Sequence, residues 1–139
     1  MIVTKRTILE DILTAISGVG GVLDGAKMHL FKTNIALSPD LDVSDFVVAD
    51  FTGYATSSAI VWATPGYDAN NVPEVLGDTK SFVAGSPITV TNTVYGYYVT
   101  DGAGTGLLYA EKFTSAVNVI NPAQILSVVP RVQGGQFVS

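Results

Sequence analysis

The sequence predicts an all-β fold, namely an antiparallel β-sandwich or jelly-roll-like domain with one N-terminal amphipathic helix. Short segments rich in β-branched and aromatic residues alternate with Gly, Pro, Asn and Asp turn signals, which is the pattern of such domains. Only one segment, near the N-terminus, has helical periodicity. The length of 139 residues corresponds to one domain. We expect a helical arm with a glycine hinge over residues 1–21, a β-sandwich domain over 22–132 and a C-terminal tail over 133–139.

The predicted helix covers residues 7–16. Thr7 and Glu10 form a T-x-x-E capping box, in which each side chain accepts a hydrogen bond from a backbone N–H left free at the helix start. Glycines at positions 18, 20 and 21 end the helix and provide a flexible joint. The apolar face is expected either to lie in a groove of a neighbour or to cap the open end of its own sandwich. This face consists of Ile8, Leu9, Ile12, Leu13 and Ile16.

The strongest strand signal is a hairpin, in which residues 94–100 and 107–113 flank a turn at 101–106. Three glycines in this turn are expected to take positive φ. Pro130 lies in the last predicted strand and cannot donate to a ladder, so this strand is expected at a sheet edge. Trp62, the only tryptophan, is expected in the core. The strands are predicted at 27–33, 53–64, 80–84, 88–91, 94–100, 107–113 and 125–132.

The chain carries little charge. Asp, Glu, Lys and Arg make up 14% of the residues, against about 25% in an ordinary soluble domain, and the mean hydropathy is +0.40. We interpret this shortage as a sign that a partner, or copies of the chain, cover part of the surface. The alternative is a neutral surface rich in Thr, Ser, Asn and Gly.

The same composition argues against two classes of partner. A net charge of −5 disfavours nucleic acid, because phosphate binding needs a basic surface. No apolar run approaches the ~20 residues of a membrane span. Glu10 and Asp11 interrupt the apolar stretch that a signal peptide would need. We therefore expect neither nucleic acid nor a membrane as a partner.

Residues that catalysis or metal binding would need are scarce. Cysteine is absent, which excludes thiolate chemistry, and His29 is the only histidine, which excludes a histidine-rich metal site. Glu74 and Glu111 cannot be assigned to a catalytic carboxylate pair from their spacing. The sequence contains no nucleophile elbow, P-loop or dinucleotide-binding fingerprint. We expect that the chain is not an enzyme and that it uses no cofactor.

An acidic stretch with Asp40, Asp42, Ser44 and Asp45 is similar to the start of a calcium loop. An EF-hand would have Gly at the sixth position and Glu at the twelfth, where this chain has Asp45 and Phe51. A solvated acidic loop is therefore expected, and a calcium site of another kind is left open.

Four features of the sequence belong together: residues 26–34 (AKMHLFKTN), residues 49–55 (ADFTGYA), Trp62, and the hairpin with YGYYVTD before its turn and LLYAEKF after it. With these features the chain resembles small virion structural proteins of tailed bacteriophages. The resemblance extends over residues 26–132, including the last strand. It implies a β-rich component of the virion and brings no catalytic residues.

The resemblance and the low charge lead us to expect a capsid decoration or cement protein. Such a protein would be made in the host cytoplasm, would lie on the capsid surface of the virion, and would bind across major capsid subunits. Its partners would be the major capsid protein, copies of itself, or both; a trimer at a local three-fold axis would suit this role. The interface is expected at the apolar helix face and, as second choice, at the edge strand of Pro130.

Two other classes of function stay open. Tyr67, Tyr97 and Tyr109 on one exposed face would favour a tail, baseplate or receptor-binding protein that contacts host glycans. Otherwise these tyrosines belong to the core and to cross-strand pairs. A small glycosidase or esterase would need a cleft with two converging carboxylates.

Overall fold

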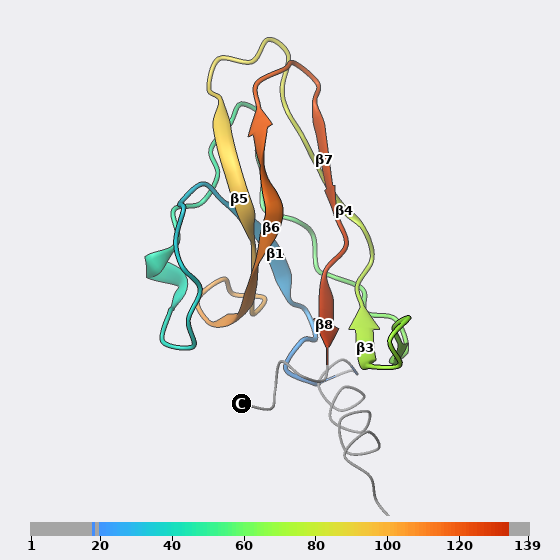
Figure 1. The fold of residues 1–139 in the computed structure, drawn as a ribbon. Helices are drawn as coiled ribbons and strands as arrows, with labels where there is room; N and C mark the ends of the chain where they lie inside the picture. The colour runs from blue at the N-terminus through green and yellow to red at the C-terminus, as the bar shows by residue number, and fades with distance from the viewer. Residues whose placement is uncertain (1–17, 19, 134–139) are drawn as a thin grey trace, which may run out of the picture.

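The computed structural model describes residue 18 and residues 20–133, and Figure 1 shows their arrangement. Three antiparallel sheets form, with the strand orders β1-β5-β6, β2-β3-β8 and β4-β7. The prediction of a β-rich, antiparallel chain is confirmed, whereas the helix predicted at residues 7–16 lies outside the described residues. The elements are β1 (Lys27–Phe31), η1 (Val43–Asp45), β2 (Gly66–Tyr67), β3 (Pro73–Leu76), β4 (Lys80–Val83), β5 (Asn92–Thr100), β6 (Leu107–Val119), β7 (Ile125–Val128) and β8 (Arg131–Gln133).

The predicted hairpin is confirmed as β5 and β6, and β6 continues to Val119, beyond the predicted end at residue 113. Asp101 closes the turn: its N–H donates to the Gly106 carbonyl (3.0 Å), and its carboxylate accepts from the Thr105 N–H (3.1 Å). The prediction of three positive φ values was wrong, because among the turn glycines only Gly104 has one (79°). Gly106 supplies space instead, since a Cβ there would lie 2.7 Å from the Asp101 carboxylate.

The main core lies on one face of the β1-β5-β6 sheet. Alternating residues of β1 and β5 point into it, and Phe82 of β4 and Val128 of β7 close it from the opposite side. Trp62 is half-buried, packs against this core, and donates its indole N–H to the Leu23 carbonyl (2.9 Å). The prediction that Trp62 packs in the core is thus confirmed in part, since its ring lies at the edge of the core.

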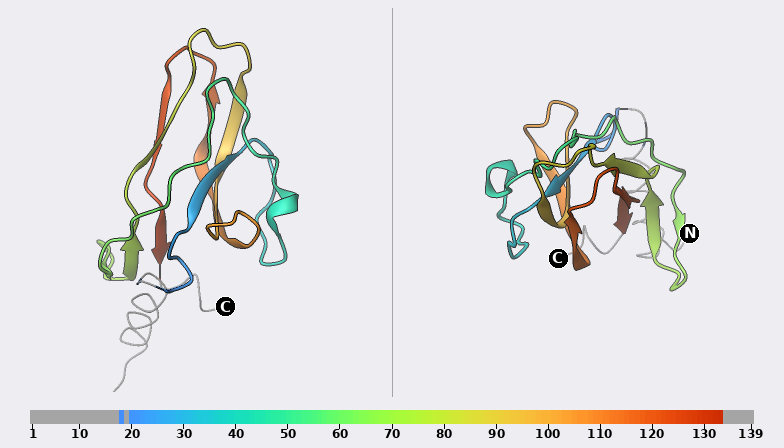
Figure 2. Two further views of the ribbon diagram at one scale, coloured as in Figure 1. Left: turned by 180° about the vertical axis from the view of Figure 1, so that it is seen from behind. Right: turned by 90° about the horizontal axis from the view of Figure 1, so that it is seen from above.

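The opposite face of the same sheet is covered by the segment between β1 and η1 and by η1 itself. In the view from above in Figure 2, this segment lies on one side of β1, β5 and β6, and β3, β4, β7 and β8 lie on the other. Phe31 and Tyr98 pack there with Phe46 in a second, smaller core. The sheet is therefore buried on both faces.

The strand predicted at residues 53–64 was wrong: this segment makes only isolated bridges, Lys27↔Ala59 and Trp62↔Gly77. The physical reason lies at the outer edge of β1. The Met28 N–H donates to the Ser57 hydroxyl (2.8 Å), and the Leu30 N–H donates to the Tyr54 hydroxyl (3.1 Å). Side chains thus take the donors that a regular ladder would have used.

Other strand boundaries also differ from the prediction. Residues 88–91 form no strand, because the N–H groups of Thr89 and Val90 donate to the Thr52 hydroxyl (2.9 Å each). The strand predicted at 125–132 is divided into β7 and β8 around Pro130. Strands β2 and β3 were not predicted, since each is short and follows turn residues.

Candidate interaction surface

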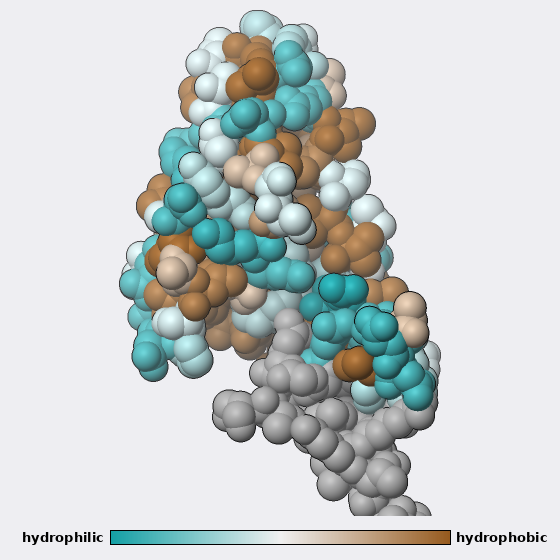
Figure 3. Space-filling view, viewed as in Figure 1, coloured by the Kyte–Doolittle hydropathy of each residue, from teal (hydrophilic) through white to brown (hydrophobic). Residues whose placement is uncertain are grey.

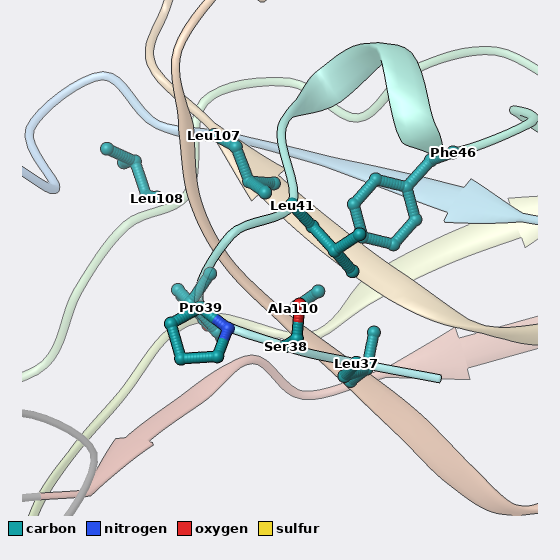
Figure 4. Close-up of a pocket in the computed structure, with 9 residues that line it drawn as sticks. Leu37, Ser38, Pro39, Leu41, Phe46, Leu107, Leu108 and Ala110 are labelled. Carbon is teal, nitrogen blue, oxygen red and sulfur yellow. The ribbon is translucent and has the colours of Figure 1, made fainter. Parts of the chain in front are cut away.

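An open apolar groove lies between the segment 37–46 and the beginning of β6. Its volume is about 420 Å³. Figure 4 shows side chains from both elements converging on it. We call it the apolar groove; it is lined by Leu37, Ser38, Pro39, Leu41, Phe46, Leu107, Leu108, Tyr109 and Ala110.

Aromatic packing positions the wall of this groove. The Phe46 ring stacks on Tyr98 of β5 at a centroid distance of 4.7 Å and meets Phe31 of β1 at 5.0 Å. Leu41 and Leu107 pack against the same cluster from the groove side. The segment is therefore fixed at Phe46, while Leu37, 38% exposed, stands at the open rim.

Polar contacts fix the two ends of the same segment. At its start, the Lys112 ammonium of β6 donates to the Asn34 amide oxygen (2.9 Å). Near its other end, Lys32 pairs with Asp50 (2.8 Å), and the Lys32 N–H donates to the Val47 carbonyl (2.8 Å). These contacts hold the segment over the sheet.

A second groove lies beside residues 42–44 and the β5–β6 turn. It measures about 410 Å³ and is lined by Asp42, Val43, Ser44, Gly104 and Thr105. We call it the turn groove, and we call the two grooves together the furrow. The turn groove thus lies at the β5–β6 turn, and the apolar groove extends along β6 as far as Ala110.

The acidic stretch uses its carboxylates to cap η1. The Asp42 carboxylate accepts from the Ser44 N–H (2.8 Å), and the Asp45 carboxylate accepts from the Asp42 N–H (2.8 Å). Hydrogen bonds from Ser44 lower the pKa of Asp42. In the described part of the chain, no three His, Asp or Glu side chains gather where they could hold a metal ion.

The outer edge of β6 has no strand partner among the described residues, because β6 ends the order β1-β5-β6. A further groove of about 290 Å³ lies between β6 and β7, lined by Tyr97, Glu111, Lys112, Phe113, Thr114, Ser127, Val128 and Val129. Grooves therefore flank this edge from residue 107 to residue 114. An exposed strand edge of this kind can accept a strand from another chain.

Apolar side chains gather on the same side of the molecule. In Figure 3, hydrophobic atoms crowd over the segment 37–46 and the start of β6, at the lower left of the view. Others are exposed on β4 and β7, where the cross-strand partners Val83 and Ile125 are 49% and 63% exposed. These side chains are candidates for burial by a partner.

The sequence-predicted interface residues are only partly placed by the structure. Ile8, Leu9, Ile12, Leu13 and Ile16 lie outside the described residues. The Pro130 ring is fully buried, and a Cβ on Gly77 would lie 2.6 Å from it. Among the strands that the structure describes, the two that flank Pro130 are edge strands as predicted, since β7 and β8 each pair with one neighbour. Contact with a partner through this edge would therefore involve residues around Pro130 and not its ring.

His29 is held as a structural residue of β1. Its Nε2 lies 2.8 Å from the Thr100 hydroxyl and its Nδ1 3.3 Å from the Thr56 hydroxyl. The imidazole stacks on Tyr98 at 4.8 Å. Burial, with a smaller contribution from the Lys27 charge, lowers its pKa. The ring thus bridges β1, β5 and the segment after Gly53.

The three tyrosines considered for glycan contact do not share an exposed face. Tyr97 is 3% exposed and donates its hydroxyl to Glu111 (2.7 Å). Tyr109 packs edge-on against Tyr97 at 6.0 Å, and burial raises the pKa of both phenols. Tyr67, 39% exposed, lies on β2 in another sheet. Tyr97 and Tyr109 are therefore core and cross-strand residues.

The two glutamates considered for hydrolysis lie on different sheets. Glu111 on β6 accepts a hydrogen bond from the Tyr97 hydroxyl, and Glu74 on β3 lies 4.0 Å from the Arg131 guanidinium.

Among residues 18 and 20–133, no helix has the length and apolar character of a membrane span. Comparison of the chain with models of protein families, with curated proteins and with solved structures finds no match.

The furrow is the functional candidate that sequence reasoning missed. Its wall comes from a segment that the sequence suggested to be an acidic loop. A usable signal was nevertheless present, because apolar residues recur through this segment at Ile35, Leu37, Leu41, Val43 and Phe46. A loop that is fully exposed to water is expected to contain fewer apolar side chains.

Proposed function

We propose that the chain is a structural protein of a phage virion, acting as a capsid decoration or cement protein that binds across major capsid subunits. We further propose that its sheets form a sandwich of the jelly-roll kind. The observation that carries the proposal is the furrow beside the outer edge of β6, which pairs with no strand in the described part of the chain. It is a ready-made docking surface on a chain with few charged residues.

The physical mechanism would be burial of apolar surface at subunit joints. Burying apolar area stabilises an interface by about 25 cal/mol per Å², and a stable interface covers about 800 Å² on each partner. The furrow alone is smaller than this. The exposed pair Val83 and Ile125 and the edge of β6 would have to contribute as well. A protein that bridges two or more capsid subunits would use such separate patches together.

The resemblance to tailed-phage proteins supports a place in the virion, and the furrow supports contact with a partner. The glycan-binding alternative loses its motivating feature with Tyr97 buried and Tyr67 on a different sheet. The hydrolase alternative loses its motivating feature, a pair of converging carboxylates, because Glu74 and Glu111 lie on separate sheets. The assembly proposal is the one that the described geometry supports best.

Quantitative mass spectrometry of purified virions tests the proposal. We expect copies of this chain in numbers comparable to those of the major capsid protein. A host cytoplasmic protein of similar size, measured in the same sample, gives the background from carry-over. A few copies per particle would assign the chain to the tail and refute the decoration role. A signal no higher than the background would refute the virion proposal altogether.

A further inference from the structure

One end of the domain is built from uncharged residues. The chain carries no Asp, Glu, Lys, Arg or His in three runs, residues 51–67, 81–100 and 113–130. Parts of these runs meet where β4 connects to β5 (84–91) and β6 connects to β7 (120–124), at the top of Figure 1. Residues 52–54 lie against the first of these connections. We call residues 52–54, 84–91 and 120–124 the uncharged tip.

Hydrogen bonds join the loops of the uncharged tip to one another. The Thr52 hydroxyl accepts from the N–H groups of Thr89 and Val90 (2.9 Å each), and the Thr52 N–H donates to the Val90 carbonyl (3.0 Å). The Gln124 carbonyl accepts from the Ala84 N–H (2.8 Å), which ties the third loop to the second. The tip is therefore held in one shape, and a partner that binds it needs to order little chain.

Apolar side chains are exposed on the uncharged tip. Val90 is 44% exposed and Ile120 is 55% exposed. Pro87, Pro122 and Ala123 are exposed in the same loops. In Figure 3, hydrophobic atoms are visible among polar ones at the top of the molecule. Burial of such a surface removes no ionic group from water, so its desolvation cost is low.

The distribution of charge favours a second copy of this chain as the occupant. The net charge is −5, so two copies repel each other. The repulsion is weakest when the copies meet through their tips, because charges are screened beyond about 8 Å at physiological salt. The charged groups next to the tip, Lys32 and Asp50, form an ion pair (2.8 Å) with no net charge, and Asn92 donates to this Asp50 carboxylate (2.8 Å).

Other occupants find no matching feature on the uncharged tip. A charged protein surface would meet no opposite charge there. A bilayer surface is bound through basic and aromatic side chains, but the tip contains no Lys or Arg. Its one aromatic residue, Tyr54, is half-buried, and its hydroxyl accepts from the Leu30 N–H (3.1 Å). The tip of another copy is itself neutral and apolar, so this surface is complementary to itself, as a two-fold interface requires.

The uncharged tip is large enough for such a contact. It comprises sixteen of the 139 residues of a chain whose accessible surface is 7669 Å². An even share of that surface is about 900 Å², and a stable interface covers about 800 Å² on each partner. Contact through the tip alone therefore reaches the size of a stable interface.

We infer that two copies of this chain bind each other end to end through their uncharged tips, with Val90 and Ile120 buried in the contact. The β5–β6 turn lies at the opposite end of the hairpin from the tip, so the dimer leaves the furrow of each copy free. The two furrows then face outward at opposite ends of the dimer. The inference does not depend on a place in the virion. If the proposed function holds, each furrow can contact a different capsid subunit.

Sedimentation equilibrium of the full chain tests the inference, with Val90→Lys as the variant and Val61→Lys as the matched control. Both substitutions add one positive charge at an exposed valine in an uncharged run, but the Val61 N–H donates to Asp78 (2.7 Å), away from the tip. We expect the natural chain and Val61→Lys to dimerise equally. Val90→Lys should raise the Kd of the dimer at least about tenfold, because each copy then buries an unpaired ammonium.

A second variant covers loss of folding. Ile120→Lys lies in another loop of the uncharged tip and should weaken the dimer to a similar extent. Far-UV circular dichroism and urea unfolding identify a variant that does not fold, and the other variant then replaces it.

Ionic strength supplies an independent readout. The tip contact contains no ion pair, and the copies repel each other, so raising NaCl from about 0.05 M to about 0.5 M should leave the dimer unchanged or tighten it. A contact made through ion pairs would weaken instead, which would contradict the inference.

The remaining outcomes are equally decisive. A natural chain that stays monomeric at about 100 μM would overturn the inference, as would equal dimerisation of Val90→Lys and Val61→Lys. Binding of the monomer to phosphatidylcholine vesicles, lost in Val90→Lys, would assign the tip to a membrane. A monomeric chain whose Val90→Lys variant is missing from virions would assign the tip to the capsid protein. A tip-dependent dimer that is absent from virions would refute the proposed function alone.

Discussion

Replacing Asn92 by Ala is expected to lower the free energy of unfolding by about 3 kcal/mol, because this side chain fastens the segment after the furrow wall to β5. Asn92 is 9% exposed. Its Oδ1 accepts from the N–H groups of Asp50 (2.7 Å) and Phe51 (2.9 Å). Its Nδ2 donates to the Asp50 carboxylate (2.8 Å) and the Thr91 carbonyl (2.7 Å).

The magnitude follows from which of these groups water can reach after the substitution. The Phe51 N–H is in a buried hydrogen bond, and leaving such a donor unsatisfied costs about 1–3 kcal/mol. The three partly buried hydrogen bonds contribute about 0.5 kcal/mol each, since water replaces them in part. The sum is about 3 kcal/mol, which corresponds to a fall in Tm of about 10 °C for a chain of this length.

Urea unfolding of the full chain measures the effect. Thr93→Ala on the same strand is the matched control, because it removes one exposed hydrogen bond, Thr93 Oγ1 to Asn118 (2.9 Å), and is expected to cost under about 0.5 kcal/mol. A loss below about 1 kcal/mol in Asn92→Ala would refute the reasoning, since the Phe51 donor alone accounts for that much.

Asn92→Asp sharpens the same test through its pH dependence. The new carboxylate keeps the acceptor for Phe51 but faces the Asp50 carboxylate, so its folded-state pKa is expected above the ordinary value of about 3.9. A raised folded-state pKa means that the stability is present at low pH and is lost as the pH rises through that pKa. Part of the lost stability should therefore return between pH 7 and pH 4.

Three further substitutions test other parts of the structure by urea unfolding. His29→Gln should remove the loss of stability that His29 causes on acidification. Because the pKa of His29 is lowered in the folded state, its contribution to stability is full above about pH 6.5 and becomes smaller as the pH falls below that value. Lys80→Met should cost about 2–3 kcal/mol, since the 7% exposed Lys80 donates to Ser58, Ala59 and Asp78. Gly96→Ala should cost at least about 3 kcal/mol, because its Cβ would collide with the Glu111 carbonyl oxygen.

The sequence was sufficient where structure depends on neighbours along the chain. The β5–β6 hairpin was predicted because alternating β-formers meet a glycine-rich turn within twenty residues. The segment 53–64 has the same local character, yet forms no strand. Its Tyr54 and Ser57 hydroxyls bond to β1, more than twenty residues away. A local sequence pattern does not show whether a distant N–H will donate to a side-chain hydroxyl or to a backbone carbonyl.

The position of the furrow could not be predicted for the same reason, although the apolar residues of its wall were visible in the sequence. It exists because Phe46 stacks on Tyr98 of β5, and three strands (β2, β3 and β4) lie between these two residues in the sequence. The low charge content did indicate a surface that a partner covers, but it did not indicate where that surface lies. The turn chemistry at Asp42 and Asp45 looked like a possible ion site and proved to cap η1. A capping box and a calcium loop use the same residue types at similar spacing.

Within residues 18 and 20–133 the outer edge of β6 pairs with no strand, and the furrow limits the risk of unspecific pairing there. A long free edge would pair with any extended chain, and proteins limit this with charges and irregular register. β6 has both: Glu111 and Lys112 lie at its middle, and its pairing with β5 shifts between Val94 and Gly96. Backbone pairing along β6 is thereby weakened. The side chains of the furrow must then select the partner, which favours an occupant with a matching apolar stripe over a generic strand.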